Sequence, residues 1–164
     1  MVREKTLELK VPAGVDDGAR LRITGEGDAG YYGGPPGDLY VFLQVAEHDF
    51  FERRESDLLC HIPISFPQAA LGAEITVPTL DGLGEKLSIP AGTQPGATFR
   101  ISGRGIAKRS GGARGDLYVT VTLVVPTRLN KEQRELLTKL AATLGTENKP
   151  IQKKILEKVK EIFS

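Results

Sequence analysis

Two aspartates stand at equivalent places in the chain and, as a pair, could do acid–base chemistry. Asp38 and Asp116 each follow a glycine in a Gly-Asp-Leu-Tyr-Val segment. Two carboxylates can divide the roles of general acid and general base only if they lie close together. Each aspartate belongs to its own copy of the segment, in a turn where Asp side chains accept backbone N–H groups. We therefore expect both to cap turns, and we predict no catalytic residue.

The other reactive side chains also have structural interpretations. His48 and Asp49 have no third partner nearby in the sequence and are assigned to a linker. Cys60 falls within an alternating apolar segment, which predicts a small buried side chain. Gly25 and Gly27 do not open a helix, which argues against a phosphate-binding loop. A basic cluster in one loop is interpreted as a solvated face, with an acidic peptide partner as the alternative: Arg100, Arg104, Lys108, Arg109 and Arg114.

The segment around the two aspartates is part of an internal duplication. Residues 33–41 recur at 111–119, an offset of 78 positions (111 − 33), and Pro12-Ala13-Gly14 recurs as Pro90-Ala91-Gly92 at the same offset. Identities continue at this offset through residues 9–45 without a gap. Two copies are too few for a solenoid, so we predict two tandem modules.

Alternating apolar and polar residues predict an all-β chain of short strands separated by glycine- and proline-rich turns. One helical turn is expected at 67–72, ended by glycine. The predicted strands are 6–11, 19–24 and 38–46 in the first copy, then 58–66, 74–78, 86–89, 98–102 and 116–125. The predicted domains are a first β-sandwich or barrel module at 1–47, a second at 48–128 and a helical segment at 129–164.

The second copy is preceded by strands that the first copy lacks. Residues 58–78 come before the shared part, and subtracting 78 places their counterparts before Met1. We therefore expect the first module to be truncated. A missing strand leaves an open sheet edge, which tends to recruit another chain.

Composition argues against several functional classes. Lys and Arg number 22 and Asp and Glu 21, so charge gives no reason to expect binding to nucleic acid or an anionic membrane. The single cysteine excludes an internal disulfide and a cysteine-rich zinc site, and it suits a reducing compartment. No apolar run approaches the ~20 residues that span a bilayer, and no secretion signal follows Met1. We expect a cytoplasmic protein.

Helical patterning follows Pro126. Asn130 is a predicted N-cap, with Gln133 completing a capping box, and a second helix is expected from Pro150. Short isolated helices are marginal in water. We therefore predict that the last helix forms a homodimer, with packing on its own barrel as the alternative. Its apolar stripe is Ile155, Leu156, Val159, Ile162 and Phe163.

Six short motifs follow one another along nearly the whole chain. Each motif alone is a weak turn-and-strand pattern, but together and in this order they resemble the C-terminal region of DnaJ-type co-chaperones. The motifs are Leu-Lys-Val-Pro-Ala-Gly at 9–14, Gly-Glu-Gly at 25–27, Gly-Asp-Leu-Tyr-Val at 37–41, and the segments 69–75, 77–82 and 99–105.

This resemblance implies two tandem barrels that hold non-native polypeptides, followed by a dimerising helical segment. In that family a zinc module interrupts the first barrel, and here it would end just before Met1, so no cofactor is expected within this chain. The His-Pro-Asp signature of the J-domain is also absent from the sequence. We expect a co-chaperone fragment that binds unfolded polypeptides for delivery to a DnaK-type chaperone.

The resemblance also implies a client-binding groove on the first module. Leu7 and Val41 match groove residues by position, and Leu9 and Leu43 share their strand faces by the two-residue period. A client would dock there as an added strand. The residues alone favour a different interpretation, in which all four belong to the core. The rest of the groove would lie before Met1.

Two other functional classes stay open. A β-sandwich carbohydrate-binding or hydrolase module would need clustered exposed aromatic residues or paired carboxylates, and neither stands out. A nucleic-acid-binding module would show affinity that falls steeply with salt concentration.

Overall fold

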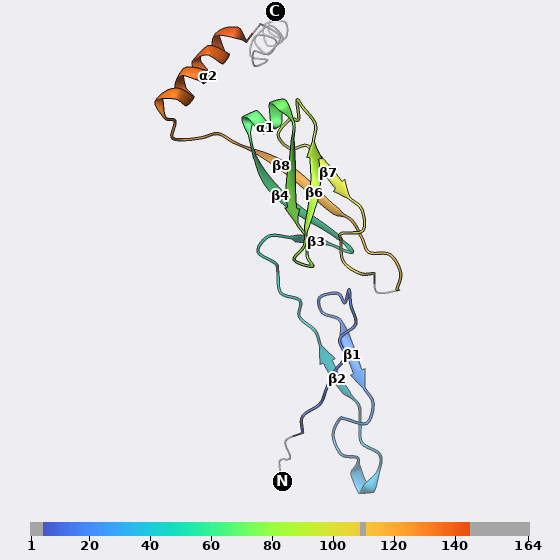
Figure 1. The fold of residues 1–164 in the computed structure, drawn as a ribbon. Coiled ribbons are helices and arrows are strands. Elements are labelled where there is room, and N and C mark those ends of the chain that lie inside the picture. Colours follow the sequence, from blue (N-terminus) through green and yellow to red (C-terminus); the bar gives the residue numbers. More distant parts are fainter. Residues whose placement is uncertain (1–4, 109–110, 145–164) are drawn as a thin grey trace, which may run out of the picture. The chain divides into compact units, whose positions relative to one another are not determined.

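The structure is a computed structural model that describes residues 5–108 and 111–144 (Figure 1). The chain divides into two compact units, Met1–Val124 and Val125–Ser164. The first unit is built of strands with one short α-helix and one 3-10 turn, and the second contains a single described helix. The predicted all-β class with a helical C-terminal segment is confirmed.

The first unit begins with a two-stranded antiparallel hairpin. Strand β1 spans Arg20–Ile23 and β2 spans Leu39–Phe42, with Leu21 opposite Val41 in the register. A long loop joins them and carries the 3-10 turn η1 at Tyr31–Gly33. Both strands lie inside the predicted ranges. Their apolar and polar residues alternate, which suits strands with one apolar face and one polar face.

The rest of the first unit is a module of two sheets. In the larger sheet β4 and β8 run parallel, and its order is β3-β4-β8-β7. Its strands are β3 (Glu52–Arg54), β4 (Asp57–Ser65), β7 (Thr98–Ile101) and β8 (Leu117–Val124). The smaller sheet pairs β5 (Ala73–Pro78) with β6 (Gly84–Ile89), and helix α1 (Phe66–Leu71) connects β4 to β5.

The core of this module lies where the two sheets pack against each other. Val119 and Val121 of β8 are fully buried, as are Val77 of β5 and, within 2 %, Ile89 of β6. Cys60 of β4 joins the same core and is 2 % exposed, as predicted. Complete burial of a Val or Ile side chain stabilises the fold by about 1.5–3 kcal/mol.

Helix α1 is fixed by local chemistry at both ends. Ser65 Oγ accepts the N–H of Gln68, and Gln68 Oε1 accepts the N–H of Ser65 at 2.9 Å, which forms a capping box. The helix ends at Gly72, which has φ 81°, and a Cβ there would lie 2.9 Å from the carbonyl oxygen of Ile89. The predicted helical turn and its glycine end are confirmed.

The predicted strand at 6–11 is wrong, because this segment is irregular in the structure. Its counterpart in the duplication is 84–89, which is β6. Strand β6 pairs with β5 along six residues, whereas the positions 78 before β5 (73 − 78 = −5) precede residue 1. A strand needs a hydrogen-bonded partner, and 6–11 has none in the described part of the chain.

The predicted linker also contains regular structure. Strand β3 lies within the charged segment 48–57 and pairs with β4, with Glu52 opposite Leu59. Phe51, at the entrance to β3, is 7 % exposed and belongs to the core. The segment was assigned to a linker because it is highly charged, but it contains a short strand at the edge of the sheet.

Helix α2 spans Lys131–Thr143 in the second unit. Asn130 accepts the N–H of Gln133 at 2.8 Å, and Gln133 Oε1 accepts the N–H of Asn130, which confirms the predicted capping box. None of its residues is buried. The predicted dimerisation stripe at Ile155, Leu156, Val159, Ile162 and Phe163 lies outside the described residues. No described helix is long and apolar enough to cross a membrane.

Candidate functional site

The hairpin β1–β2 has one apolar face and one polar face. The apolar face carries side chains that are only half-buried, although its sequence pattern is that of a core: Leu21, Ile23, Leu39, Val41 and Leu43. On the opposite face Arg20 lies over the ring of Tyr40, with its guanidinium 4.8 Å from the ring centroid. Phe42 follows on that face and is 71 % exposed.

The hairpin β7–β8 repeats this backbone at the 78-residue offset. Leu21 opposite Val41 becomes Phe99 opposite Val119. The N–H of Leu43 donates to the carbonyl oxygen of Ala19 at 2.8 Å, and the matching bond in the second hairpin is 2.9 Å. The two hairpins therefore present the same positions to the same face.

Burial separates the two hairpins despite their common register. Val119 is 0 % exposed, whereas Val41, at the same position, is only partly buried. In the second module the residues of β5 and β6 pack against this face, including Val77 and Leu87. The first hairpin has no equivalent covering sheet within the described residues. Among residues 5–108 and 111–144, no second sheet therefore closes its apolar face, and this face is called open below.

The four residues predicted for client binding all lie half-buried in this first part of the chain. Val41 is in β2, and Leu43 follows it and continues the pairing with the segment before β1. Leu7 and Leu9 stand in the irregular segment, near a 2.5 Å ion pair between Lys5 and Glu26 of the β1–β2 loop.

The two aspartates act as turn caps in their own hairpins. Asp38 accepts the N–H of Gly25 at 3.0 Å and forms a 2.5 Å ion pair with Arg22. Asp116 accepts the N–H of Gly103 at 2.9 Å. Each carboxylate bonds within its own hairpin, which confirms the capping interpretation.

Two titratable groups have shifted pKa values for structural reasons. Burial raises the pKa of the Cys60 thiol, which keeps it protonated and poorly reactive. The hydrogen bond from Thr79 to Asp81 holds the pKa of that carboxyl below its usual value, helped by backbone N–H groups and by Arg104. Both groups belong to the structural part of the second module.

The predicted basic cluster is partly neutralised within the chain. Arg104 pairs with Glu85 at 2.5 Å and approaches Asp81 at 3.6 Å, and Arg100 approaches Asp116 at 3.5 Å. Lys108 and Arg114 are exposed, and Arg109 lies outside the described residues. In the described ranges, no group of three or more His, Cys, Asp or Glu side chains is placed to hold a metal ion.

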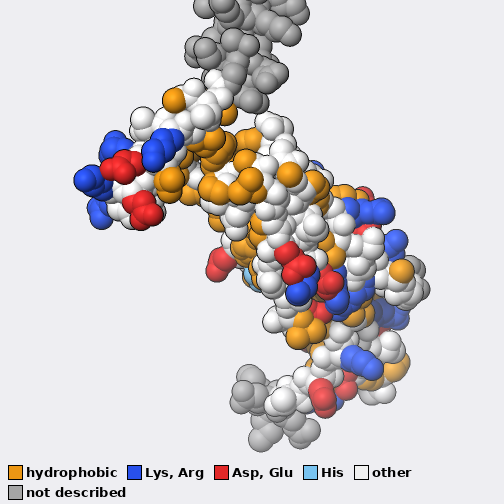
Figure 2. Space-filling view, turned by 45° about the horizontal axis from the view of Figure 1, so that its top comes forward, with side chains coloured by type: hydrophobic (Ala, Val, Ile, Leu, Met, Phe, Trp, Pro, Cys, Tyr) orange, Lys and Arg blue, Asp and Glu red, His pale blue; other side chains and the backbone are white. Residues whose placement is uncertain are grey.

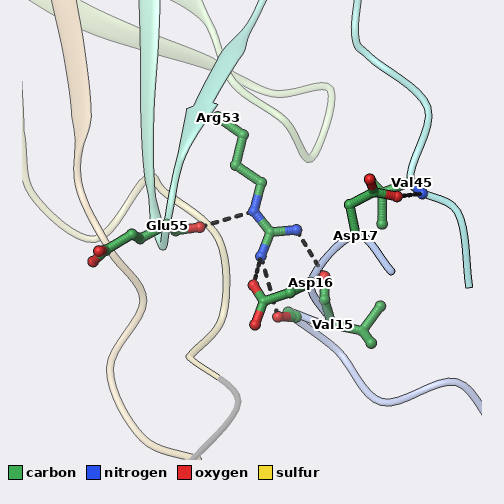
Figure 3. Close-up of polar contacts among 7 residues, drawn as sticks. Val15, Asp16, Asp17, Val45, Arg53 and Glu55 are labelled. Atoms are coloured by element: carbon green, nitrogen blue, oxygen red, sulfur yellow. Dashed lines mark hydrogen bonds and ion pairs between the residues drawn. The ribbon is translucent and has the colours of Figure 1, made fainter. Parts of the chain in front are cut away.

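The sequence analysis did not predict the hydrogen bonds of the Arg53 side chain (Figure 3). Its guanidinium donates from Nη1 to the carbonyl oxygen of Val15 at 2.7 Å and from Nη2 to the carboxylate of Asp16 at 2.7 Å. Nε donates to the carbonyl oxygen of Glu55 at 2.8 Å. This side chain of β3 thus joins the segment before β1 to the second module.

Exposed apolar side chains are a second missed feature. Figure 2 shows that orange side chains interrupt the charged surface of the protein. Tyr31 and Tyr32, at the tip of the β1–β2 loop, are more than 90 % exposed. Leu71 and Leu83 of the second module are 80 % and 64 % exposed. Their positions outside strands gave no periodic signal from which exposure could be predicted.

Comparison with known proteins agrees with this architecture. The model of the DnaJ C terminal domain family matches residues 1–126. That range includes both hairpins, the two-sheet module and the open apolar face. The chain belongs to the DnaJ C-terminal domain family. This assignment replaces the alternative of a carbohydrate-binding or hydrolase module.

Individual relatives extend the similarity into the helical segment. The chain is 48 % identical over 161 residues to "Chaperone protein DnaJ" from Halothermothrix orenii, covering 98 % of this chain and 43 % of that protein. The same name and identity apply to a protein from Methylobacterium radiotolerans, with 98 % and 42 % covered. A "Chaperone protein DnaJ" from Brevibacillus choshinensis is 54 % identical over 144 residues, with 88 % and 38 % covered. The chain spans less than half the length of these relatives.

Proposed function

We propose that this chain is a chaperone region that binds non-native polypeptides on the open apolar face of the hairpin β1–β2. The observation that carries the proposal is the contrast between Val41 and Val119. These residues share a register position, yet Val119 is 0 % exposed and Val41 is only partly buried. An apolar face with a core-like pattern and no cover favours an apolar occupant.

The backbone of β2 supports the same proposal. Its counterpart β8 pairs on one side with β7 and on the other with β4, from Leu58 opposite Leu117 to Ser65 opposite Val124. In the described part of this chain β2 pairs with β1 alone. An extended client segment on the unpaired edge would gain backbone hydrogen bonds that are independent of its sequence. Leu7, Leu9, Val41 and Leu43 would hold its apolar side chains.

The proposal extends to the cellular role of the protein. Bound clients would be passed to a DnaK-type chaperone in the cytoplasm. The name of the relatives, "Chaperone protein DnaJ", supports the chaperone part of this role. We assign homodimerisation to the last predicted helix, with Ile155, Leu156, Val159, Ile162 and Phe163 at the interface. Two faces per dimer would raise the apparent affinity for a long unfolded client through avidity. No step of this mechanism requires a catalytic residue.

Fluorescence anisotropy of a labelled, permanently unfolded polypeptide tests the proposal. We expect the chain to bind the unfolded form in preference to the folded form, and the Leu7→Ser/Val41→Ser variant to bind at least about tenfold more weakly, because two apolar contacts are lost. Both side chains are only partly buried, so the variant should still fold.

The matched control is Leu71→Ser/Leu83→Ser, which also replaces two apolar side chains by serine, at exposed positions of the second module. This control should bind like the unmodified chain. The hairpin face would be rejected as the client site if both variants lost affinity equally. It would also be rejected if the chain bound the folded and the unfolded polypeptide with equal affinity.

A further inference from the structure

A cavity with a volume of about 950 Å³ lies within the first unit, beside Arg53. Part of its wall is apolar and open to solvent: Val45 and Phe50 are each 38 % exposed, and Leu80 is 46 % exposed. We call this cavity, with these three residues and the acidic residues named below, the junction pocket. Its size is that of a site for a small ligand or for a few side chains of a peptide.

The charged residues of the lining are mostly acidic. Arg53 is the one Lys or Arg residue among the lining residues. The chain as a whole is almost neutral, with 22 basic and 21 acidic residues, so the negative charge is concentrated locally. The acidic lining residues are Asp16, Asp17, Glu47, Asp49, Glu52 and Glu55.

Several of these carboxylates already have structural partners. Asp16 pairs with Arg53 at 2.7 Å, and Asp17 accepts the N–H of Val45 at 2.8 Å (Figure 3). The described ion pairs leave Glu47 and Asp49 without a partner, and both are exposed. These two carboxylates are therefore available to an outside cation.

The segment that carries Glu47 and Asp49 is held in place. His48 Nδ1 accepts the N–H of Phe50 at 3.0 Å and the N–H of Phe51 at 3.2 Å. The rings of Phe50 and Phe51 meet edge to face with centroids 4.9 Å apart. Because Phe51 is anchored in the core, the acidic segment is ordered before any ligand arrives, which lowers the entropy cost of binding.

We propose that the junction pocket binds a peptide segment in which a lysine or arginine stands beside an apolar side chain. The apolar side chain packs on Val45, Phe50 and Leu80, and the cation lies near Glu47 and Asp49. This inference rests on the proposed function and deepens it, because it adds a charge-selective contact to the apolar face of the hairpin. A client with basic and apolar residues in sequence would engage both sites.

The test uses three labelled peptides with the same apolar residues and two variable positions, filled by lysine, glutamine or glutamate. The chain should bind the lysine peptide about fivefold more tightly than the glutamine peptide at low salt, and the glutamate peptide most weakly, as expected for two exposed ion pairs. The lysine preference should shrink as salt concentration rises, because ions screen exposed charges.

The Glu47→Gln/Asp49→Asn variant should lose the lysine preference while keeping its affinity for the glutamine peptide. The matched control Glu132→Gln/Glu135→Gln removes the same charge from exposed positions of α2 and should keep the preference. Equal binding of lysine and glutamine peptides, or a preference that survives in the Glu47/Asp49 variant, overturns the inference.

The two proposals can fail separately in this experiment. Loss of glutamine-peptide binding in the Leu7→Ser/Val41→Ser variant, with no lysine preference in the unmodified chain, would uphold the hairpin site and reject the junction pocket. Lysine-peptide binding that depends on Glu47 and Asp49, but is indifferent to Leu7 and Val41, would uphold the junction pocket and reject the hairpin site.

Discussion

At the scale of single residues, Val41 and Val119 show that the same side chain can be buried to different degrees in two copies of a motif. Both sit in Gly-Asp-Leu-Tyr-Val segments and share a register position. The sequence analysis could not separate them, because burial depends on what packs above the face rather than on the residue or its neighbours. The resemblance alone marked Val41 for a binding role.

The difference in burial between Val41 and Val119 predicts different losses of stability when each is replaced by alanine. Val119→Ala should destabilise the folded chain by about 2 kcal/mol, because it removes two methyl groups from a closed core and leaves a cavity. Val41→Ala should cost less than about 1 kcal/mol, because its side chain is already partly in water. Urea denaturation followed by circular dichroism measures both values. Equal losses of stability would mean that Val41 is a core residue.

Arg53 shows why a residue can escape sequence analysis. Besides the nearby carbonyl oxygen of Glu55, its acceptors are the carbonyl oxygens of Gly14 and Val15 and the carboxylate of Asp16, which lie 37–39 positions earlier in the chain. No local pattern links residues so far apart. In the sequence Arg53 is one charge in a segment rich in charges, and that composition led to its assignment as linker.

At the scale of elements, local chemistry made most of the fold predictable. The hairpin strands follow from alternation, α1 follows from the segment 67–72 with its terminal glycine, and α2 follows from the capping box at Asn130. Glycine at Gly72 ends α1 because that position has φ 81°. These features depend on a few neighbouring residues, which the sequence displays directly.

The elements that were mispredicted depend on partners. Residues 6–11 have the alternation of a strand but no paired neighbour in the described chain, so they remain irregular. Strand β3 has the charged composition of a linker but gains a partner in β4. Alternation indicates which residues suit a strand, whereas pairing decides whether the strand forms.

At the scale of the whole molecule, the proposed dimer makes a prediction about mass. Residues 145–164 contain the apolar stripe assigned to the interface. Light scattering should give the mass of two chains for residues 1–164 and of one chain for residues 1–144, because the shorter chain lacks the whole apolar stripe assigned to the interface. Equal assembly states for the two lengths would end the dimer proposal.

The central claim is that the apolar face of the first hairpin, which no second sheet covers in the described part of the chain, receives a non-native polypeptide. Amide hydrogen exchange of the chain with and without a saturating unfolded polypeptide tests it most directly. We predict slower exchange at residues 39–43 and 7–9 on binding, with little change at 117–121, whose face is already closed. Protection confined to the second module, or absent despite measurable binding, would contradict the account.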